Sequence, residues 1–311
     1  MNLTMDQLQG RLEENGYICD EELVVTLYLA LKLGRPLLVE GAPGVGKTEV
    51  AKSLARALDT ELIRLQCYEG LDETRALYEW NYQRQLLKIQ IARGSCDDAA
   101  LEKDLFDLEY LLERPLLKAI RAHRQVVLLI DEVDKTDPEF EAFLFELLSD
   151  FQVSIPEVGT LQARHIPAVV LTSNGERELS DGLKRRCVYL YIDYPSVEKE
   201  MRILQVKVPE AKEGLARQVV RAVHYIRTHL DLQKKPSIAE TLDWARALVA
   251  LHADVLTPEA VGLTLNLLLK NREDQAVLKQ QVGLAGLVSQ IAGGEGDLPR
   301  AACQCAHCHH G

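Results

Sequence analysis

The sequence predicts an α/β fold with a parallel five-stranded sheet, followed by a smaller all-α domain. The first observation is that short runs of branched apolar residues alternate with helical segments over residues 1–194, as in layered α/β domains. The second is a glycine-rich loop directly after the first of these runs. The third is a change of pattern near residue 195, after which the chain has a helical character to about residue 291.

Five apolar runs are predicted to form the strands of the sheet. The third and fourth runs are apolar nearly throughout, which is typical of strands buried on both faces of a parallel sheet. The five runs lie at residues 37–39, 62–65, 126–130, 168–172 and 188–192.

Helices are predicted before and between these strands. Residues 23–33 follow an acidic start and end just before Gly34, which is a helix stop signal. Residues 138–149 place apolar side chains at helical spacing after Asp137 and Pro138, a common helix start.

Two segments exceed what the sheet requires. Residues 71–113 are long, charged and helix-prone, and we expect an inserted helical pair there. Residues 151–166 alternate and then turn near Pro156 and Gly159, which predicts a β-hairpin insert. Both projections are candidates for contact with a client or partner, and the alternative is plain structural decoration.

Composition excludes several classes of protein. The chain has 311 residues and a net charge of −11, which is poorly suited to gripping nucleic acid, so we expect no nucleic-acid partner. No apolar run approaches the ~20 residues of a transmembrane segment, and the first ten residues lack a signal-peptide pattern. Single, scattered cysteines are typical of a cytoplasmic protein with reduced thiols. They are Cys19, Cys67, Cys96 and Cys187.

The glycine-rich loop is a complete G-x-x-x-x-G-K-T motif between the first strand and a helical stretch at 49–58, the context that a phosphate-binding loop requires. Its glycines let the backbone wrap phosphates, and its N–H groups face the anion. Lys47 is expected to reach the β- and γ-phosphates, and Thr48 to ligate Mg²⁺, so ATP and Mg²⁺ are the predicted ligands. The motif consists of Gly41, Ala42, Pro43, Gly44, Val45, Gly46, Lys47 and Thr48.

The third strand delivers two adjacent carboxylates at its carboxyl end. Asp131 is expected to hold Mg²⁺ directly or through water, and Glu132 to polarise the water that attacks the γ-phosphate. The pair favours a hydrolase over a nucleoside kinase, which has no need of a water-activating glutamate.

Two further side chains complete the predicted site. Asn174 ends the fourth strand, where it can hydrogen-bond the γ-phosphate or the attacking water, unless it is only a turn residue. Arg185 and Arg186 precede the fifth strand, and an arginine there can supply charge to a neighbouring subunit's nucleotide in trans. We favour Arg186 in this role, the alternative being a surface arginine or a local ion pair.

These motifs in this order resemble the AAA+ ATPases, and more closely the MoxR family, over roughly residues 17–290. The resemblance rests on residues 41–48, 129–134, 154–160, 171–174 and 184–187. Residues 78–87 and 235–246 look like the CoxD-type branch of that family.

The resemblance implies a P-loop AAA+ core over residues 1–194 and a helical lid over 195–291. It implies an ATPase that forms a ring, most often a hexamer, with ATP at the subunit interfaces. It also implies an ATP-dependent chaperone that remodels or matures a client metalloenzyme, usually with a partner that carries a von Willebrand A domain. The CoxD-like branch is associated with maturation of molybdenum hydroxylases, notably carbon monoxide dehydrogenase.

The chain departs from the MoxR pattern at the start of the lid. MoxR proteins commonly carry Ser-Pro-Arg there, with the arginine sensing the γ-phosphate, whereas this chain has Ser237, Ile238 and Ala239. Arg246, two turns further along, is a candidate substitute, unless it faces solvent or a carboxylate.

Residues 292–311 are predicted to be a flexible tail that is rich in cysteine and histidine. Its thiols and imidazoles suit Zn²⁺ or Cu⁺, but the spacing is not that of a structural zinc site. The tail is therefore either an unstructured segment with incidental metal affinity or a functional metal-handling tail. The residues concerned are Cys303, Cys305, His307, Cys308, His309 and His310.

Three other functions compete with an ATP-driven chaperone. A nucleotide-gated scaffold with incidental hydrolysis is favoured slightly by the absent lid arginine. A nucleic-acid ATPase, such as a clamp loader, is opposed by the acidic composition. A metal-delivery protein would act through the tail.

Overall fold

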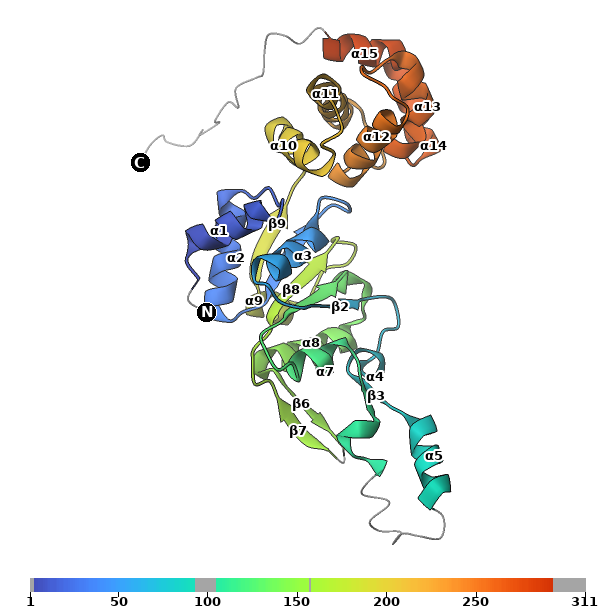
Figure 1. The fold of residues 1–311 in the computed structure, drawn as a ribbon. Coiled ribbons are helices and arrows are strands. Elements are labelled where there is room, and N and C mark those ends of the chain that lie inside the picture. The colour runs from blue at the N-terminus through green and yellow to red at the C-terminus, as the bar shows by residue number, and fades with distance from the viewer. Residues whose placement is uncertain (1–2, 93–104, 157, 293–311) are drawn as a thin grey trace, which may run out of the picture. The chain divides into compact units, whose positions relative to one another are not determined.

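The computed structural model describes residues 3–92, 105–156 and 158–292 (Figure 1). The chain divides into two compact units, Met1–Pro195 and Ser196–Gly311, and each is treated separately below. The first unit contains the sheet, and the elements described in the second unit are helices joined by loops.

The central sheet of the first unit has five parallel strands in the order β2-β5-β8-β1-β9. All five predicted strands are confirmed, with bounds that differ from the expected ones by two residues at most. Leu38 of β1 lies between Leu171 of β8 and Tyr189 of β9, so the glycine-rich loop leaves the sheet from an inner strand. The strands are β1 Leu37–Gly41, β2 Leu62–Gln66, β5 Val127–Asp131, β8 Ala168–Ser173 and β9 Val188–Ile192.

Each face of the sheet is covered by its own hydrophobic core, because alternate residues of a strand point to opposite faces. Val127 and Leu129 pack with α1 Met5–Glu14, α2 Glu21–Leu33 and α3 Lys47–Ala57. Leu128 and Ile130 pack on the opposite face with α7 Pro115–Ile120 and α8 Pro138–Asp150. Burial on both faces explains why β5 and β8 are apolar almost throughout.

The helices begin and end at the residues that the sequence marks. Helix α2 ends at Gly34, whose φ of 62° lies in the left-handed region. Helix α8 begins after Asp137, whose carboxylate accepts a hydrogen bond of 2.8 Å from the N–H of Phe140, and Pro138 occupies its first turn.

The described part of the insert at residues 71–113 contains a helix and also two strands that we did not expect. Helix α5 Tyr82–Ala92 is present, but β3 Tyr78–Trp80 and β4 Leu111–Glu113 form an antiparallel two-stranded sheet beside it. The aromatic residues explain the difference, since Tyr78 and Trp80 favour strands and their rings pack edge to face at 6.2 Å. The insert also contains α4 Glu73–Ala76 and η1 Leu108–Tyr110, and residues 93–104 lie outside the described part.

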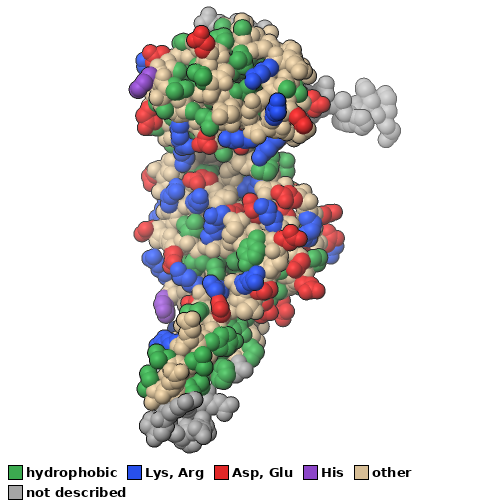
Figure 2. Space-filling view, turned by 90° about the vertical axis from the view of Figure 1, so that its right-hand side faces the viewer, with side chains coloured by type: hydrophobic (Ala, Val, Ile, Leu, Met, Phe, Trp, Pro, Cys, Tyr) green, Lys and Arg blue, Asp and Glu red, His purple; other side chains and the backbone are tan. Residues whose placement is uncertain are grey.

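Several large apolar side chains of this insert are exposed. Leu86, Leu87 and Ile91 of α5 are 59%, 56% and 72% exposed, and Figure 2 shows hydrophobic side chains gathered in the lower part of that view. Helix α5 therefore buries only a narrow stripe, which includes Gln85.

The β-hairpin insert is confirmed. Strands β6 Gln152–Ile155 and β7 Gly159–Gln162 pair antiparallel, and Val153 and Ile155 are buried in the core beneath α8.

A buried ion pair joins two helices of the second unit. Arg227 of α11 donates two hydrogen bonds of 2.6 and 2.9 Å to Glu200 of α10, and a third of 2.6 Å to the carbonyl of Pro236. Trp244 of α12 is fully buried and donates to Thr264 of α13 at 2.7 Å. The helices are α10 Val197–Lys207, α11 Glu213–His229, α12 Ile238–Ala250, α13 Pro258–Leu268, α14 Arg272–Gln281 and α15 Leu284–Ala292.

None of the helices described in either unit is long and apolar enough to cross a membrane.

Gly41, at the end of β1, offers a test of packing between strands. A Cβ atom there would lie 2.2 Å from the carbonyl oxygen of Ile192, so Gly41→Ala is expected to lower the free energy of unfolding by about 1–3 kcal/mol. Gly10, inside α1, has open space around it, so Gly10→Ala should raise this free energy by about 0.5–1 kcal/mol. Scanning calorimetry of the two variants would check the opposite signs, and equal effects would contradict the packing argument.

Candidate functional site

The site is built where the inner strands of the sheet end. Strands β1, β5 and β8 run parallel, so the residues that follow Gly41, Asp131 and Ser173 come together at one edge. Ligands of open α/β sheets bind at such carboxyl edges.

The glycine-rich loop connects β1 to the amino end of α3. Gly44 and Gly46 have φ values of 79° and 102°, a backbone conformation that side chains other than glycine rarely adopt. Gly46 precedes the first turn of α3, which no side chain caps, whereas Asp137 caps α8. An uncapped helix start behind a left-handed loop fits a phosphate group.

Lys47 is buried, and its ammonium group is held in place by three oxygens. It donates hydrogen bonds of 2.8 Å to the carbonyls of Gly41 and Ala42, and one of 2.7 Å to Oδ1 of Asn174. Burial lowers the pKa of Lys47, while the nearby carboxylates of Asp134 and Asp131 act in the opposite direction. The structure thus brings Asn174 to the phosphate-binding lysine.

Asp131 lies beside Thr48 with its carboxylate almost fully buried. Its Oδ1 accepts hydrogen bonds of 3.0 Å from Thr48 Oγ1 and 2.6 Å from Thr172 Oγ1. Its Oδ2 forms an ion pair of 2.5 Å with Arg64 of β2. The Thr48 hydroxyl and the Asp131 carboxylate are hard oxygen donors of the kind that Mg²⁺ takes, so the residues present fit this ion.

Glu132 has an unusual backbone. Its φ of 58° and ψ of 50° place it in the left-handed region, which for such a residue costs of order 1–3 kcal/mol and is common at functional sites. Its N–H donates to Thr172 Oγ1 at 2.9 Å. Its carboxylate accepts hydrogen bonds of 2.7 Å from Lys135 and 3.0 Å from Gln66. The bond to Glu132 raises the pKa of Lys135.

The loop after β8 is anchored by a buried carboxylate. Asp134 belongs to the short helix η2 Val133–Lys135, and its Oδ2 accepts hydrogen bonds of 3.0 Å from the N–H groups of Asn174 and Glu176. The backbone of Asn174 is therefore tied to the residues that follow Glu132.

Arg186 lies apart from this cluster. It ends helix α9 Asp181–Arg186, is exposed, and its guanidinium carbon lies 4.4 Å from the centre of the Phe145 ring. Within the described residues it has no ion pair, and Arg185 beside it is also exposed.

The remaining sequence-predicted candidates belong to other parts of the chain. Arg246 is on α12 of the second unit, where it forms an exposed ion pair of 3.1 Å with Asp243. The cysteine- and histidine-rich tail lies outside the described residues.

Sequence reasoning missed five residues that organise the site. Strand β2 is paired with β5 so that Gln66 lies opposite Asp131, and the alternation of Arg64 and Gln66 along that strand was the available signal. Thr172 was visible as a polar residue at the end of an apolar run. No signal identified the roles of Asp134 and Lys135, because both depend on the turn that Glu132 makes.

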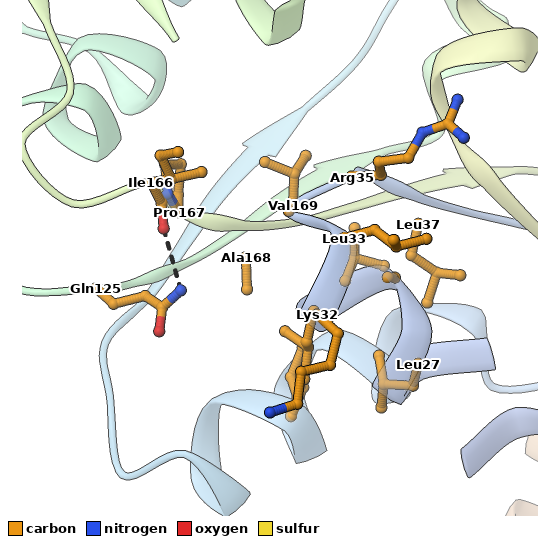
Figure 3. A pocket seen from close by; sticks show the side chains of 15 residues that line it. Leu27, Lys32, Leu33, Arg35, Leu37, Gln125, Ile166, Pro167, Ala168 and Val169 are labelled. Carbon is orange, nitrogen blue, oxygen red and sulfur yellow. Dashed lines mark hydrogen bonds between the residues drawn. The ribbon is translucent and has the colours of Figure 1, made fainter. Parts of the chain in front are cut away.

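A cavity of about 300 Å³ lies at the opposite, amino edge of the sheet (Figure 3). It is lined by Leu27 and Leu33 of α2, by the start of β8 and by Gln125, which donates to the carbonyl of Ile166 at 3.1 Å. Arg35 is at its rim, but its side chain points away from the apolar wall. No residue of the candidate site lines this cavity.

Residues 36–187 match the family model described as AAA domain (dynein-related subfamily). An uncharacterized protein of Staphylococcus haemolyticus is 24% identical over 283 residues, which cover 87% of this chain and 98% of that protein. The gas vesicle ATPase GvpN of Haloferax mediterranei is 24% identical over 212 residues, which cover 65% of this chain but only 59% of that protein.

Among solved structures, a variant of RuvB from Thermotoga maritima has a similar fold. Its TM-score is 0.52 at 18% identity, and the match covers 90% of this chain and 84% of that one. Together with the family match and the strand order, this likeness shows that the first unit has the P-loop AAA+ fold.

Removal of the Lys47 ammonium group is expected to abolish nucleotide binding. Lys47→Ala should show no binding by titration calorimetry at ATP and Mg²⁺ concentrations that saturate the unmodified protein, because a buried cation is lost from the phosphate loop. Arg56→Ala removes the same charge from the exposed side of α3 and is the matched control. Retention of ATP binding by Lys47→Ala would contradict this role.

Proposed function

We propose that this chain is an ATP-hydrolysing AAA+ protein of the MoxR type. The observation that carries the proposal is the hydrogen bond between Thr48 and Asp131, 3.0 Å long, which joins the phosphate loop to the carboxylate pair. Lys47 and Asn174, bonded to each other, lie in the same cluster of residues. The phosphate loop, the carboxylate proposed to bind the metal ion and the proposed base thereby lie at one edge of the sheet.

Substrate binding requires the side chains of the site to change partners. Lys47 would release Asn174 and the loop carbonyls and turn to the β- and γ-phosphate oxygens. Thr48 and Asp131 would hold Mg²⁺, which neutralises charge on those oxygens. Asp131 would then give up its ion pair with Arg64 and bind Mg²⁺ instead. Arg64 can move away because its side chain is about half exposed.

The chemical step is hydrolysis of the bond between the β- and γ-phosphates. Glu132 accepts a proton from the attacking water, whose oxygen bonds to the γ-phosphorus, and ADP leaves with the electron pair of the broken bond. Asn174 orients the water or the γ-phosphate. Lys135 and Gln66 both bond to Oε2 of Glu132, so Oε1 is the oxygen that would accept the proton.

A ring of subunits, most often a hexamer, would complete the site. Arg186 is exposed at the end of α9 with its guanidinium group over the face of the Phe145 ring, and this exposure would make it available to a neighbouring subunit's nucleotide. An arginine acting in this way stabilises the charge of the transition state. The relatives named gas vesicle ATPases support hydrolysis as the activity.

The proposed role of hydrolysis is remodelling or maturation of a client metalloenzyme, such as a molybdenum hydroxylase, with a von Willebrand A domain protein as partner. The sequence resemblance to the MoxR family and its CoxD-like branch supports this role. The exposed apolar side chains of α5 offer a surface for client contact, since exposed apolar patches commonly mark interaction sites.

A nucleotide-gated scaffold is the second candidate function. The observation that favours it is that Glu132 is bonded to Lys135 and Gln66, and Asp131 to Arg64. If these bonds persist after ATP binds, Asp131 stays paired with Arg64 instead of binding Mg²⁺, and hydrolysis is incidental.

Substitution of the proposed base separates these two functions. Glu132→Gln should bind ATP as tightly as the unmodified protein but hydrolyse it about 10²–10⁴-fold more slowly, because the amide cannot accept the proton. Glu139→Gln makes the same change on the exposed start of α8 and should leave turnover unaltered. Phosphate release measured at saturating ATP would check this, and equal rates in all three proteins would favour the scaffold.

The dependence of the ATP hydrolysis rate on protein concentration tests the shared site, that is, a nucleotide site completed by Arg186 of a neighbouring subunit. Hydrolysis per subunit should rise with concentration as subunits assemble, and Arg186→Ala should lower the assembled rate by about 10³-fold or more. Assembly itself can be followed by sedimentation. A rate that is independent of concentration and of Arg186 would overturn the shared site.

A further inference from the structure

The carboxyl end of α9 is held by an arginine that is about 150 residues away in the sequence. A helix leaves its last carbonyl groups without partners inside the helix. Arg35 is the hydrogen-bond donor to two such carbonyl groups in α9. Its Nε donates to the carbonyl of Arg186 at 3.0 Å, and its terminal nitrogen donates to the carbonyl of Arg185. The planar guanidinium group thereby bonds to the carbonyls of both residues at once.

The backbone of Arg35 is itself fixed on both sides. Its N–H donates to the carbonyl of Ala30 at 3.0 Å, which closes the end of α2 after Gly34. The carbonyl of the next residue, Pro36, accepts a hydrogen bond of 2.8 Å from Val188, at the start of β9. Figure 3 shows the side chain turned away from the cavity beside it, which is consistent with its bonds to α9.

The two arginines therefore have different surroundings. Arg35 takes the carbonyl oxygens at the end of α9, and a cation is favourable there because the partial charge of these groups is negative. The guanidinium of Arg186 is left on the ring of Phe145, 4.4 Å from its centre, facing outward with the side chain exposed. Loss of Arg35 would free the helix end and allow the Arg186 backbone to move.

We infer that Arg35 is a positioning residue for Arg186, which it holds in the orientation that serves a neighbouring subunit. The inference rests on the proposed function, because it requires that Arg186 acts in trans. It predicts a defect in turnover and no defect in nucleotide affinity, since the guanidinium group of Arg35 bonds to the end of α9, whereas Thr48 and Asp131 of the nucleotide site bond to each other. A misplacement of about 1 Å at such a group can cost about a hundredfold in rate.

The first test is the rate at saturating ATP in Arg35→Ala and Arg35→Lys. Arg35→Ala should lose about a hundredfold in turnover with an unchanged dissociation constant for ATP. Arg35→Lys retains the charge without the planar fork, so it should recover part of the loss. Unchanged turnover in Arg35→Ala, or a loss of ATP affinity equal to the loss of rate, would overturn the inference.

The decisive test is complementation between subunits. Lys47→Ala subunits should lack ATP binding but keep α9 intact, whereas Arg35→Ala subunits bind ATP but present Arg186 poorly. When the two variants are mixed, hydrolysis should exceed the sum of their separate rates, because an intact Arg186 then faces a competent nucleotide site. A folding defect caused by the loss of Arg35 could not be repaired in this way.

The mixture of Arg186→Ala with Lys47→Ala is the matched control. If this control regains activity but the Arg35→Ala mixture does not, the positioning role is overturned while the shared site stands. If the control also fails, the shared site of the proposed function is overturned, and the role of Arg35 with it.

Discussion

The hydroxyl group of Thr172 connects the two strands that carry the site. It accepts the N–H of Glu132 and donates to the carboxylate of Asp131, so one oxygen at the end of β8 orients both carboxylates after β5. The bond to the N–H also helps to hold Glu132 in its left-handed conformation, which would otherwise relax. Parallel pairing of β5 with β8 brings the hydroxyl within reach, and the position of the site therefore depends on the register of these strands.

The charged groups of the site have polar or charged partners within this chain. A buried charge is costly unless it is paired, and each of the three key groups has a partner within this chain. Lys47 is bonded to oxygens, Asp131 to Arg64, and Glu132 to Lys135. Binding of nucleotide is then an exchange of partners, in which polar groups that the protein already holds are replaced by those of the ligand.

Much of the fold, but less of the site, could be predicted from the sequence. The strands and the phosphate loop, with Lys47, could be predicted because apolar runs and glycine spacing are local properties. Asp131 and Asn174 followed from their places at strand ends. The partners of these residues could not be predicted, because Arg64 and Lys135 approach the site only through strand order and through the turn at Glu132. The strand at Tyr78–Trp80 was also missed, because its partner lies about thirty residues away.

The distribution of tryptophan gives each unit its own spectroscopic label. The chain has two tryptophans, Trp80 in the insert of the α/β unit and Trp244 in the core of the helical unit. Trp80 is partly exposed beside the rings of Tyr78 and Phe106, whereas Trp244 is fully enclosed and bonded to Thr264. Their emission should therefore differ in wavelength, with the enclosed indole further to the blue. Fluorescence of the unmodified chain can then follow the two units independently during denaturation, without any attached dye.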